Sequence, residues 1–179
     1  MRIRLRFVVP LLGTMALLFG LAPSASADME EWWLKYKESG NYLCLTISGA
    51  STADNALLVE STCAYSGNTQ AAQEIRLLGN SPTYMMNIRR SNKCLDGYDG
   101  WYVRQLPCTG GTSQYWHLDF ISSDQYGGNR HYLFRNAQTN LCMTGSSLGA
   151  YVLQTTCSIT NIKQNWWQGL EVLPPWDPR

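Results

Sequence analysis

The chain has 179 residues, 45% of them hydrophobic, with 14 Lys and Arg against 13 Asp and Glu. That length corresponds to one domain, or to one domain with tails. The nearly neutral balance argues against nucleic acid and against a polybasic membrane patch, because both interactions depend on many cationic contacts.

Residues 1–27 have the organisation of an export signal. Arg2, Arg4 and Arg6 precede an apolar run from Phe7 to Leu21, and Ala25–Ala27 is a small-residue cleavage pattern. A membrane anchor is the alternative, but the run is shorter than the roughly 20 residues that a spanning helix needs. We therefore predict cleavage near Ala27 and an extracellular protein, with residues 28–179 as a single domain and no membrane span.

All six cysteines follow this segment. Cleavage would remove three arginines and no acidic residue, leaving 11 basic against 13 acidic residues. An even cysteine count after an export signal predicts disulfides. Zinc is disfavoured because the chain has no C-x-x-C and only two histidines, His117 and His131. We predict no metal and no cofactor.

The cysteines mark a threefold repeat. Each repeat has an aromatic-rich apolar run, a first cysteine, a branched aliphatic residue, a Glu or Gln three positions before a second cysteine, and then a Gln. The last landmark is Gln73-Glu-Ile75, Gln114-Tyr-Trp116 and Gln164-Asn-Trp166, with Gln 10, 6 and 7 residues after the second cysteine. Cysteines with the same role should pair alike, which predicts Cys44–Cys63, Cys94–Cys108 and Cys142–Cys157.

Short runs rich in Tyr, Val, Ile, Thr and Trp, separated by Gly, Asn, Ser and Pro, are typical of strands. The repeats are expected at about 33–78, 79–120 and 121–170, with a tail at 171–179.

One segment, residues 69–78, also has helical spacing, at Ala71, Ala72, Ile75 and Leu78. We interpret this segment as a strand instead, because its register matches the Gln-x-Trp strands of the other repeats. A propeller is a further alternative, although three blades would be few.

Two cysteines followed by Gln-x-Trp, three times over, resemble the ricin B-chain lectin family. The most specific motifs are Lys93-Cys-Leu-Asp96, Gln114-Tyr-Trp116 and Gln164-Asn-Trp166, within residues 33–170. The resemblance implies an all-β protein: a β-trefoil of three four-stranded repeats with pseudo-threefold symmetry and one disulfide per repeat. Trp116, Trp166 and the replacement Ile75 are then expected in the shared core.

The resemblance also implies sugar binding in surface pockets. In the family, an Asp two residues after the first cysteine accepts hydrogen bonds from sugar hydroxyls, an aromatic residue two before the second cysteine stacks on the ring, and an Asn before Gln-x-Trp completes the polar set. No repeat here is complete. The three positions hold Thr46, Ser61 and Ala72 in the first repeat, Asp96, Leu106 and Ser113 in the second, and Thr144, Thr155 and Lys163 in the third.

The second repeat is closest to the family pattern, with Asp96 and Gln114. Nearby Asp99, Trp101 and Tyr102 supply an acid and aromatic rings from another direction, and Trp101 is expected at a loop tip. The alternative role of Asp96 is to cap a turn, because Asp followed by Gly, as in Asp96-Gly97, is typical of turns. The sequence names no particular sugar, galactose-type or other.

Tryptophans near the two ends suggest a second surface. A trefoil brings its termini together, so Trp32, Trp33, Trp167 and Trp176 are expected to cluster. This cluster either seals the barrel or contacts a partner protein.

Catalysis is not expected. The chain lacks G-x-S-x-G and H-E-x-x-H, and Asp96 and Asp99 are too weak a signal for a glycosidase pair. We predict a secreted, non-catalytic, lectin-like protein. The alternatives are a non-catalytic delivery or scaffolding subunit of a secreted toxin or other assembly, with degenerate sugar sites, and a trefoil protease inhibitor, which the Gln-x-Trp repeats resemble poorly.

Overall fold

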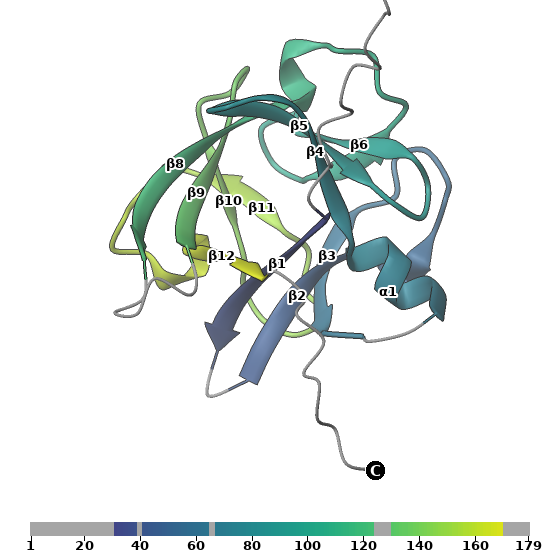
Figure 1. The fold of residues 1–179 in the computed structure, drawn as a ribbon, viewed down its shortest axis with the longest axis horizontal. Coiled ribbons are helices and arrows are strands. Elements are labelled where there is room, and N and C mark those ends of the chain that lie inside the picture. Colours follow the sequence, from purple (N-terminus) through teal and green to yellow (C-terminus); the bar gives the residue numbers. More distant parts are fainter. Residues whose placement is uncertain (1–30, 39–40, 65–66, 124–129, 170–179) are drawn as a thin grey trace, which may run out of the picture.

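The computed structural model describes residues 31–38, 41–64, 67–123 and 130–169 (Figure 1). This part of the chain contains twelve strands, four in each of three successive lobes. Lobe one comprises β1 (Glu31–Glu38), β2 (Asn41–Ile47), β3 (Leu58–Thr62) and β4 (Ile75–Asn80). Lobe two comprises β5 (Thr83–Ile88), β6 (Lys93–Asp96), β7 (Arg104–Leu106) and β8 (Tyr115–Ser123). Lobe three comprises β9 (Arg130–Asn136), β10 (Cys142–Thr144), β11 (Leu153–Thr155) and β12 (Trp166–Gly169).

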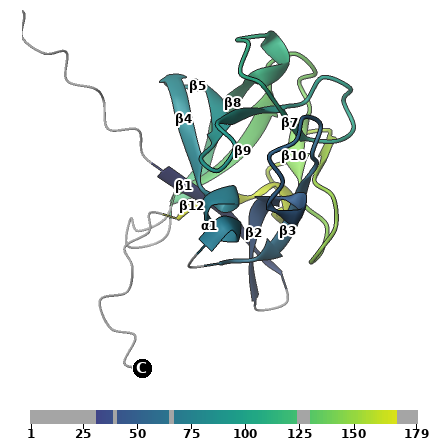
Figure 2. The ribbon, with the colours of Figure 1, turned by 90° about the vertical axis from the view of Figure 1, so that its right-hand side faces the viewer.

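Six of these strands close a barrel. Antiparallel pairing runs from β1 to β4, β5, β8, β9 and β12, and β12 pairs with β1 again. The remaining strands form three hairpins, β2–β3, β6–β7 and β10–β11, one from each lobe. Figure 2 shows β3, β7 and β10 together on one side of the molecule, with β4 and β5 on the other. The fold is therefore the expected β-trefoil, a barrel with a cap of three hairpins.

The cap is held by a ring of backbone hydrogen bonds around the pseudo-threefold axis. The N–H of Leu58 donates to Val103 O at 2.8 Å, that of Val103 to Val152 O at 3.2 Å, and that of Val152 to Leu58 O at 2.9 Å. Each of these residues lies five positions before the second cysteine of its lobe and is fully buried. The branched aliphatic residue that recurs in the sequence is thus the point where the three lobes meet.

The core lies inside the barrel and is built from equivalent positions of the lobes. Trp116, Trp166 and Ile75 are fully buried, which confirms their expected core role. The indole Nε1 of Trp116 donates to Leu95 O at 3.2 Å, and that of Trp166 to Met143 O at 3.0 Å. Each acceptor follows the first cysteine of its lobe, so these tryptophans tie the barrel to the hairpin while filling the core.

The three predicted disulfides are present, each within one lobe: Cys44–Cys63, Cys94–Cys108 and Cys142–Cys157. A buried glutamine secures the chain beside each. The side-chain oxygen of Gln73 accepts from the N–H of Ala64 at 2.8 Å, and its nitrogen donates to Thr62 O at 2.9 Å. Gln114 and Gln164 make the same two bonds on either side of their own second cysteines. The recurring glutamine therefore clamps the loop after the disulfide.

The strand expected over residues 69–78 is wrong in its first half. Residues Gly67–Gln73 form helix α1, and the strand begins only at Ile75. Lobes two and three have a single 3-10 turn at the equivalent place, η2 (Thr112–Gln114) and η3 (Ile162–Gln164). Lobe one has 10 residues from its second cysteine to its glutamine instead of 6 or 7. The extra residues, including the strong helix former Ala71, lengthen the turn into a helix without moving the glutamine.

Candidate functional site

Asp96 lies at the end of β6 and is only 4% exposed. Its Oδ1 accepts from the N–H of Tyr98 at 3.1 Å, and its Oδ2 accepts from Ser113 Oγ at 2.8 Å. Arg104 Nε lies 3.7 Å from Oδ1. Asp96 thus caps the turn that starts at Gly97, and it bonds to Ser113, the residue at the family's Asn position.

Gln114, the second polar residue predicted in this site, is 2% exposed. Its oxygen accepts from the N–H of Thr109, and its nitrogen donates to Pro107 O. Both ends of the amide are therefore engaged within the protein, and a role in sugar binding stays a prediction.

The other three predicted residues lie together on the surface beyond this turn. Asp99 is exposed, and its Oδ1 accepts from the N–H of Trp101 at 3.0 Å and from the N–H of Tyr102 at 3.1 Å. Trp101 is 70% exposed and Tyr102 is 41% exposed. The Asp99 carboxylate fixes the backbone of the loop at the point where it presents two aromatic rings to solvent.

Tyr102 also contacts an aromatic residue of another lobe. Its ring meets that of Tyr151 edge to face, with centroids 5.7 Å apart and planes at 84°. Both residues directly precede the residues of the backbone ring, Val103 and Val152. Because side chains alternate along a strand, the tyrosines face outward where the valines face the core.

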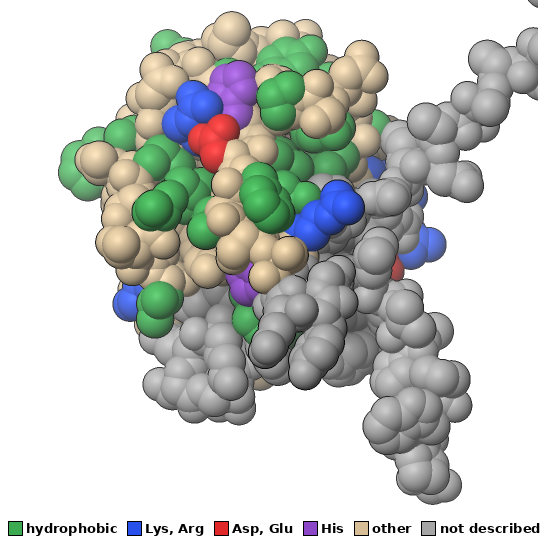
Figure 3. Space-filling view, turned by 60° about the vertical axis from the view of Figure 1, so that its left-hand side comes forward, with side chains coloured by type: hydrophobic (Ala, Val, Ile, Leu, Met, Phe, Trp, Pro, Cys, Tyr) green, Lys and Arg blue, Asp and Glu red, His purple; other side chains and the backbone are tan. Residues whose placement is uncertain are grey.

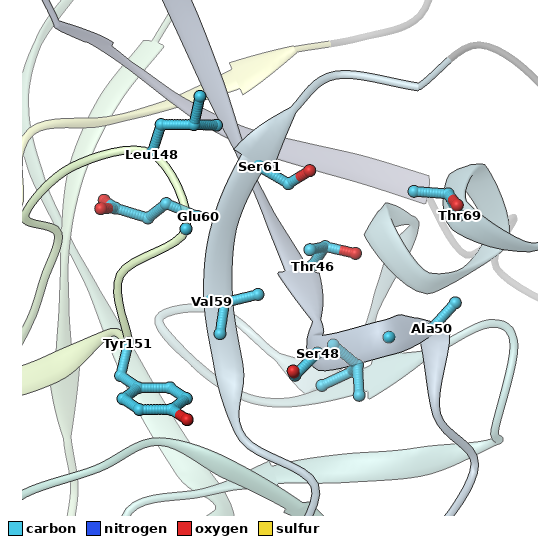
Figure 4. Close-up of a pocket in the computed structure, with 12 residues that line it drawn as sticks. Thr46, Ser48, Ala50, Val59, Glu60, Ser61, Thr69, Leu148 and Tyr151 are labelled. Atoms are coloured by element: carbon cyan, nitrogen blue, oxygen red, sulfur yellow. The ribbon is translucent and has the colours of Figure 1, made fainter.

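Tyr151 in turn lines a pocket of about 570 Å³ between lobes one and three. Register places Thr46 opposite Val59 and Val59 opposite Tyr151, so these residues form one row across three chain segments. Figure 4 shows Thr46, Ser61 and Thr69 on the α1 side of β3, with Tyr151 and Leu148 on the other side. The volume is within the range of small-molecule sites.

The threonine two residues after the first cysteine, Thr46 in lobe one and Thr144 in lobe three, has different hydrogen bonds in the two lobes. The Thr144 hydroxyl donates to Cys142 O at 3.0 Å, is hydrogen-bonded to Thr155 Oγ1 at 2.8 Å, and accepts from Gln164 Nε2 at 2.9 Å. The equivalent hydroxyl of Thr46 is buried in the pocket wall and has no hydrogen-bond partner among the described residues. In the sequence Thr46 is visible only as a departure from the family pattern, and no single repeat predicts this pocket.

The predicted tryptophan cluster is only partly described. The ring of Trp167 lies 5.1 Å from that of His131, and His131 Nδ1 lies 2.7 Å from Asn165 Oδ1. Trp32 and Trp33 lie in β1, where the structure describes backbone pairing: Trp32 opposite Ile75 and Trp33 opposite Gly169. Trp176 lies outside the described residues, so the cluster and its partner stay predictions.

A second hollow lies between the β4–β5 turn and the β8–β9 pair. It has a volume of about 620 Å³ and is lined by Pro82, Phe120, Arg130 and Tyr132, among others. Figure 3 views this side of the molecule and shows hydrophobic side chains scattered among polar ones. Nearby, Arg135 forms a two-point ion pair with Asp119, at 2.7 and 3.1 Å, and this hydrogen bonding raises the pKa of Arg135. No residue predicted to bind sugar lines this hollow.

Within the described residues, no group of three or more His, Cys, Asp and Glu side chains is placed to hold a metal ion. The same part of the chain contains no helix that is long and apolar enough to cross a membrane.

Residues 32–166 match the ricin-type beta-trefoil lectin domain, and the chain belongs to that family. No catalytic domain is detected beside it. Comparison with curated proteins gives no match.

Solved structures support the same fold. ThreeFoil, a designed threefold-symmetric protein, is 27% identical, with 79% of this chain and 99% of that chain covered and a TM-score of 0.63. A Polyporus squamosus lectin bound to the epitope Neu5Aca2-6Galb1-4GlcNAc is 16% identical, and the match covers 79% of this chain and 49% of the lectin chain, with a TM-score of 0.60. A chain of the cytolethal distending toxin from Actinobacillus actinomycetemcomitans is 15% identical, and the match covers 86% of this chain and 99% of the toxin chain, with a TM-score of 0.62.

Proposed function

We propose that this protein is a secreted, non-catalytic carbohydrate-binding protein, and that lobe two carries its main site. The observation that carries the proposal is the exposed Trp101, which Asp99 holds at the edge of a ricin-type lectin domain. The apolar C–H face of a sugar ring suits stacking on an aromatic surface. A tryptophan that is 70% exposed on a loop is typical of a binding contact rather than of the core.

Polar recognition comes from the same loop. An ionised carboxylate has about four acceptor positions, and the two backbone bonds that Asp99 accepts both fall on Oδ1. The carboxylate therefore keeps acceptor capacity for sugar hydroxyls beside the indole. We assign Asp96 to the support of this loop, because its buried carboxylate accepts from the N–H of Tyr98. We assign Gln114 to the support of the neighbouring chain at Pro107 and Thr109, to which its buried amide bonds.

A glycan array with matched variants tests the proposal. We expect wild-type protein to bind a subset of glycans, and Trp101→Ala to weaken that binding by at least about tenfold, which corresponds to the loss of one good aromatic contact. Phe120→Ala is the matched control, since Phe120 is 61% exposed but lies on the barrel strand β8.

Full binding by Trp101→Ala would contradict the assignment to lobe two. A wild-type protein that binds no glycan, yet is recovered with a partner protein, would instead favour the delivery or scaffolding subunit.

A further inference from the structure

We infer that Gln154 of lobe three is a positioning residue for the glycan site of lobe two, so that one lobe sets the affinity of its neighbour. Gln154 holds both ends of the loop Gly97–Trp101, which presents Asp99 and Trp101 to solvent. The inference rests on the proposed carbohydrate-binding function and adds to it the part of the fold that fixes the shape of the site.

Gln154 contacts the loop at two points. Its side-chain nitrogen Nε2 donates to Gly97 O at 3.0 Å, at the beginning of the loop. Its backbone N–H donates to Trp101 O at 2.8 Å, at the end of the loop. Gly97 O also accepts from the N–H of Gly100 at 3.2 Å, so the same carbonyl closes the turn within the loop. One residue of lobe three thus fixes the distance between the two ends of the loop.

Lobe three in turn holds the Gln154 side chain in place. Gln154 is 4% exposed, and its side-chain oxygen accepts from Thr139 Oγ1 at 2.9 Å. The N–H of Thr139 donates to Oδ1 of the fully buried Asn136 at 3.1 Å. Both ends of the Gln154 amide are therefore bonded in a buried site, where an unpaired polar group is costly. The amide connects the loop of lobe two to β9 and β11 of lobe three.

The loop packs against this amide at Gly97, where a side chain would not fit. A Cβ atom on Gly97 would lie 2.6 Å from Gln154 Oε1 and 2.8 Å from Asn136 Nδ2. The N–H of Gly97 and Asn136 Nδ2 also share the acceptor Ser113 O, at 3.0 and 2.7 Å. A larger residue at position 97 would therefore push the loop away from lobe three.

The backbone bond at Trp101 recurs in all three lobes, but its acceptor residue differs. The N–H of Gln105 donates to Ala56 O at 2.9 Å. That of Glu60 donates to Ala150 O at 3.0 Å. Trp101 occupies the position of these two alanines, seven residues before the second cysteine of its lobe. Lobe two thus places an exposed indole on a backbone position that the fold fixes in every lobe, and a side chain held in this way loses less entropy on binding.

Gln154→Ala tests the inference, with Gln105→Ala as the matched control. The amide of Gln105 makes the equivalent bonds to the lobe-one loop, at Ser51 O and Ala53 O, so both variants should shift the midpoint of chemical denaturation by similar amounts. Affinity is measured by calorimetry with the array glycan that wild-type protein binds most tightly. Gln154→Ala should bind it at least about fivefold more weakly, because binding must then order the loop, and Gln105→Ala should stay within about twofold of wild type.

Hydrogen exchange of the free protein gives a readout that needs no glycan. Peptides covering residues 97–102 should exchange at least about threefold faster in Gln154→Ala than in wild type, and at the wild-type rate in Gln105→Ala. Gly97→Ala disturbs the same contact from the loop side and should also weaken binding, with Gln154 intact. The losses of affinity in Gly97→Ala and Gln154→Ala should not add in the double variant, because both release one contact.

Wild-type affinity in folded Gln154→Ala and Gly97→Ala, with binding still lost in Trp101→Ala, overturns the inference and leaves the proposed function standing. Equal weakening by Gln154→Ala and Gln105→Ala also overturns it, because the loss would then follow stability alone. If Gln154→Ala does not fold, Gly97→Ala decides, and wild-type affinity in that variant overturns the inference. Wild-type protein that binds no glycan on the array overturns the proposed function, and the role of Gln154 in binding falls with it.

Discussion

The side-chain amide of Gln105 donates to the carbonyl oxygen of Ala53, in the neighbouring lobe, at 2.9 Å. It also donates to Ser51 O at 3.0 Å and accepts from Ser91 Oγ at 2.7 Å. The equivalent residues continue the pattern around the axis: Gln154 donates to Gly97 O at 3.0 Å, and Glu60 accepts from the N–H of Ser146 at 2.7 Å. Each lobe thus holds a loop of the preceding lobe around the axis with one buried side chain.

Gln105→Ala should therefore lower the free energy of unfolding by about 1–3 kcal/mol. The carbonyl oxygens of Ser51 and Ala53 and the hydroxyl of Ser91 would all lose the hydrogen bond to the Gln105 side chain. Chemical denaturation measures the change. Gln138→Ala is the control, since Gln138 is exposed and the substitution should stay within about 0.5 kcal/mol. Equal stability of Gln105→Ala and wild type would show that the lobes do not depend on this contact.

Thr144→Val and Thr46→Val should differ in stability although the residues are equivalent. Thr144→Val breaks three hydrogen bonds and should cost about 1–3 kcal/mol. Thr46→Val removes a hydroxyl that has no partner among the described residues, so stability should be unchanged or slightly higher. Unfolding curves of the two variants without ligand make the comparison. A large loss in Thr46→Val would mean that its hydroxyl is satisfied within the protein.

Asp99→Ala should weaken glycan binding by roughly three- to tenfold with little loss of stability. The substitution frees the N–H groups of Trp101 and Tyr102, so that binding must order a loop which the wild type already holds. Titration of an array-selected glycan measures the effect. Asp99→Asn keeps an acceptor oxygen and should recover part of the affinity. An unchanged affinity in Asp99→Ala would show that the loop needs no such support.

Asp96→Asn distinguishes the two roles considered for that residue. An amide oxygen still accepts from Tyr98 N, and the amide nitrogen can donate to Ser113 Oγ, so the turn should persist. We expect glycan affinity within about threefold of wild type if Asp96 acts only as a cap. Complete loss of binding in a folded Asp96→Asn protein, seen by titration and circular dichroism, would instead support direct contact with the sugar.

The threefold spacing of the cysteines predicts the disulfides, and the resemblance of the repeats to the ricin B-chain family predicts the trefoil and the tryptophan core. These features repeat because each lobe must make the same connection to the barrel. Helix α1 differs from the predicted strand because the local helical spacing of this segment prevails over the symmetry of the repeats. The longer interval before Gln73 was visible in the sequence, and it was the signal for an additional turn.

The pocket could not be read from any one repeat, because its walls come from lobes that are distant in sequence. Thr46 and Tyr151 meet only when β3 pairs with the segment at Tyr151. One signal was nevertheless present: Tyr102 and Tyr151 both lie six residues before a second cysteine. Equivalence by repeat therefore locates surface residues as well as core residues. The burial of Asp96, in contrast, depends on the packing of its own turn against Ser113, which spacing does not encode.

The pairing of β1 with β12 closes the barrel between the first and last described strands, with Trp33 opposite Gly169. The end of β1 leads into β2 of the cap, so the beginning of β1 lies at the end of the barrel away from the cap. The last described residue of β12 lies beside that end, because Gly169 is opposite Trp33. A surface that holds the barrel at this end would leave the three hairpins of the cap free to meet an incoming glycan.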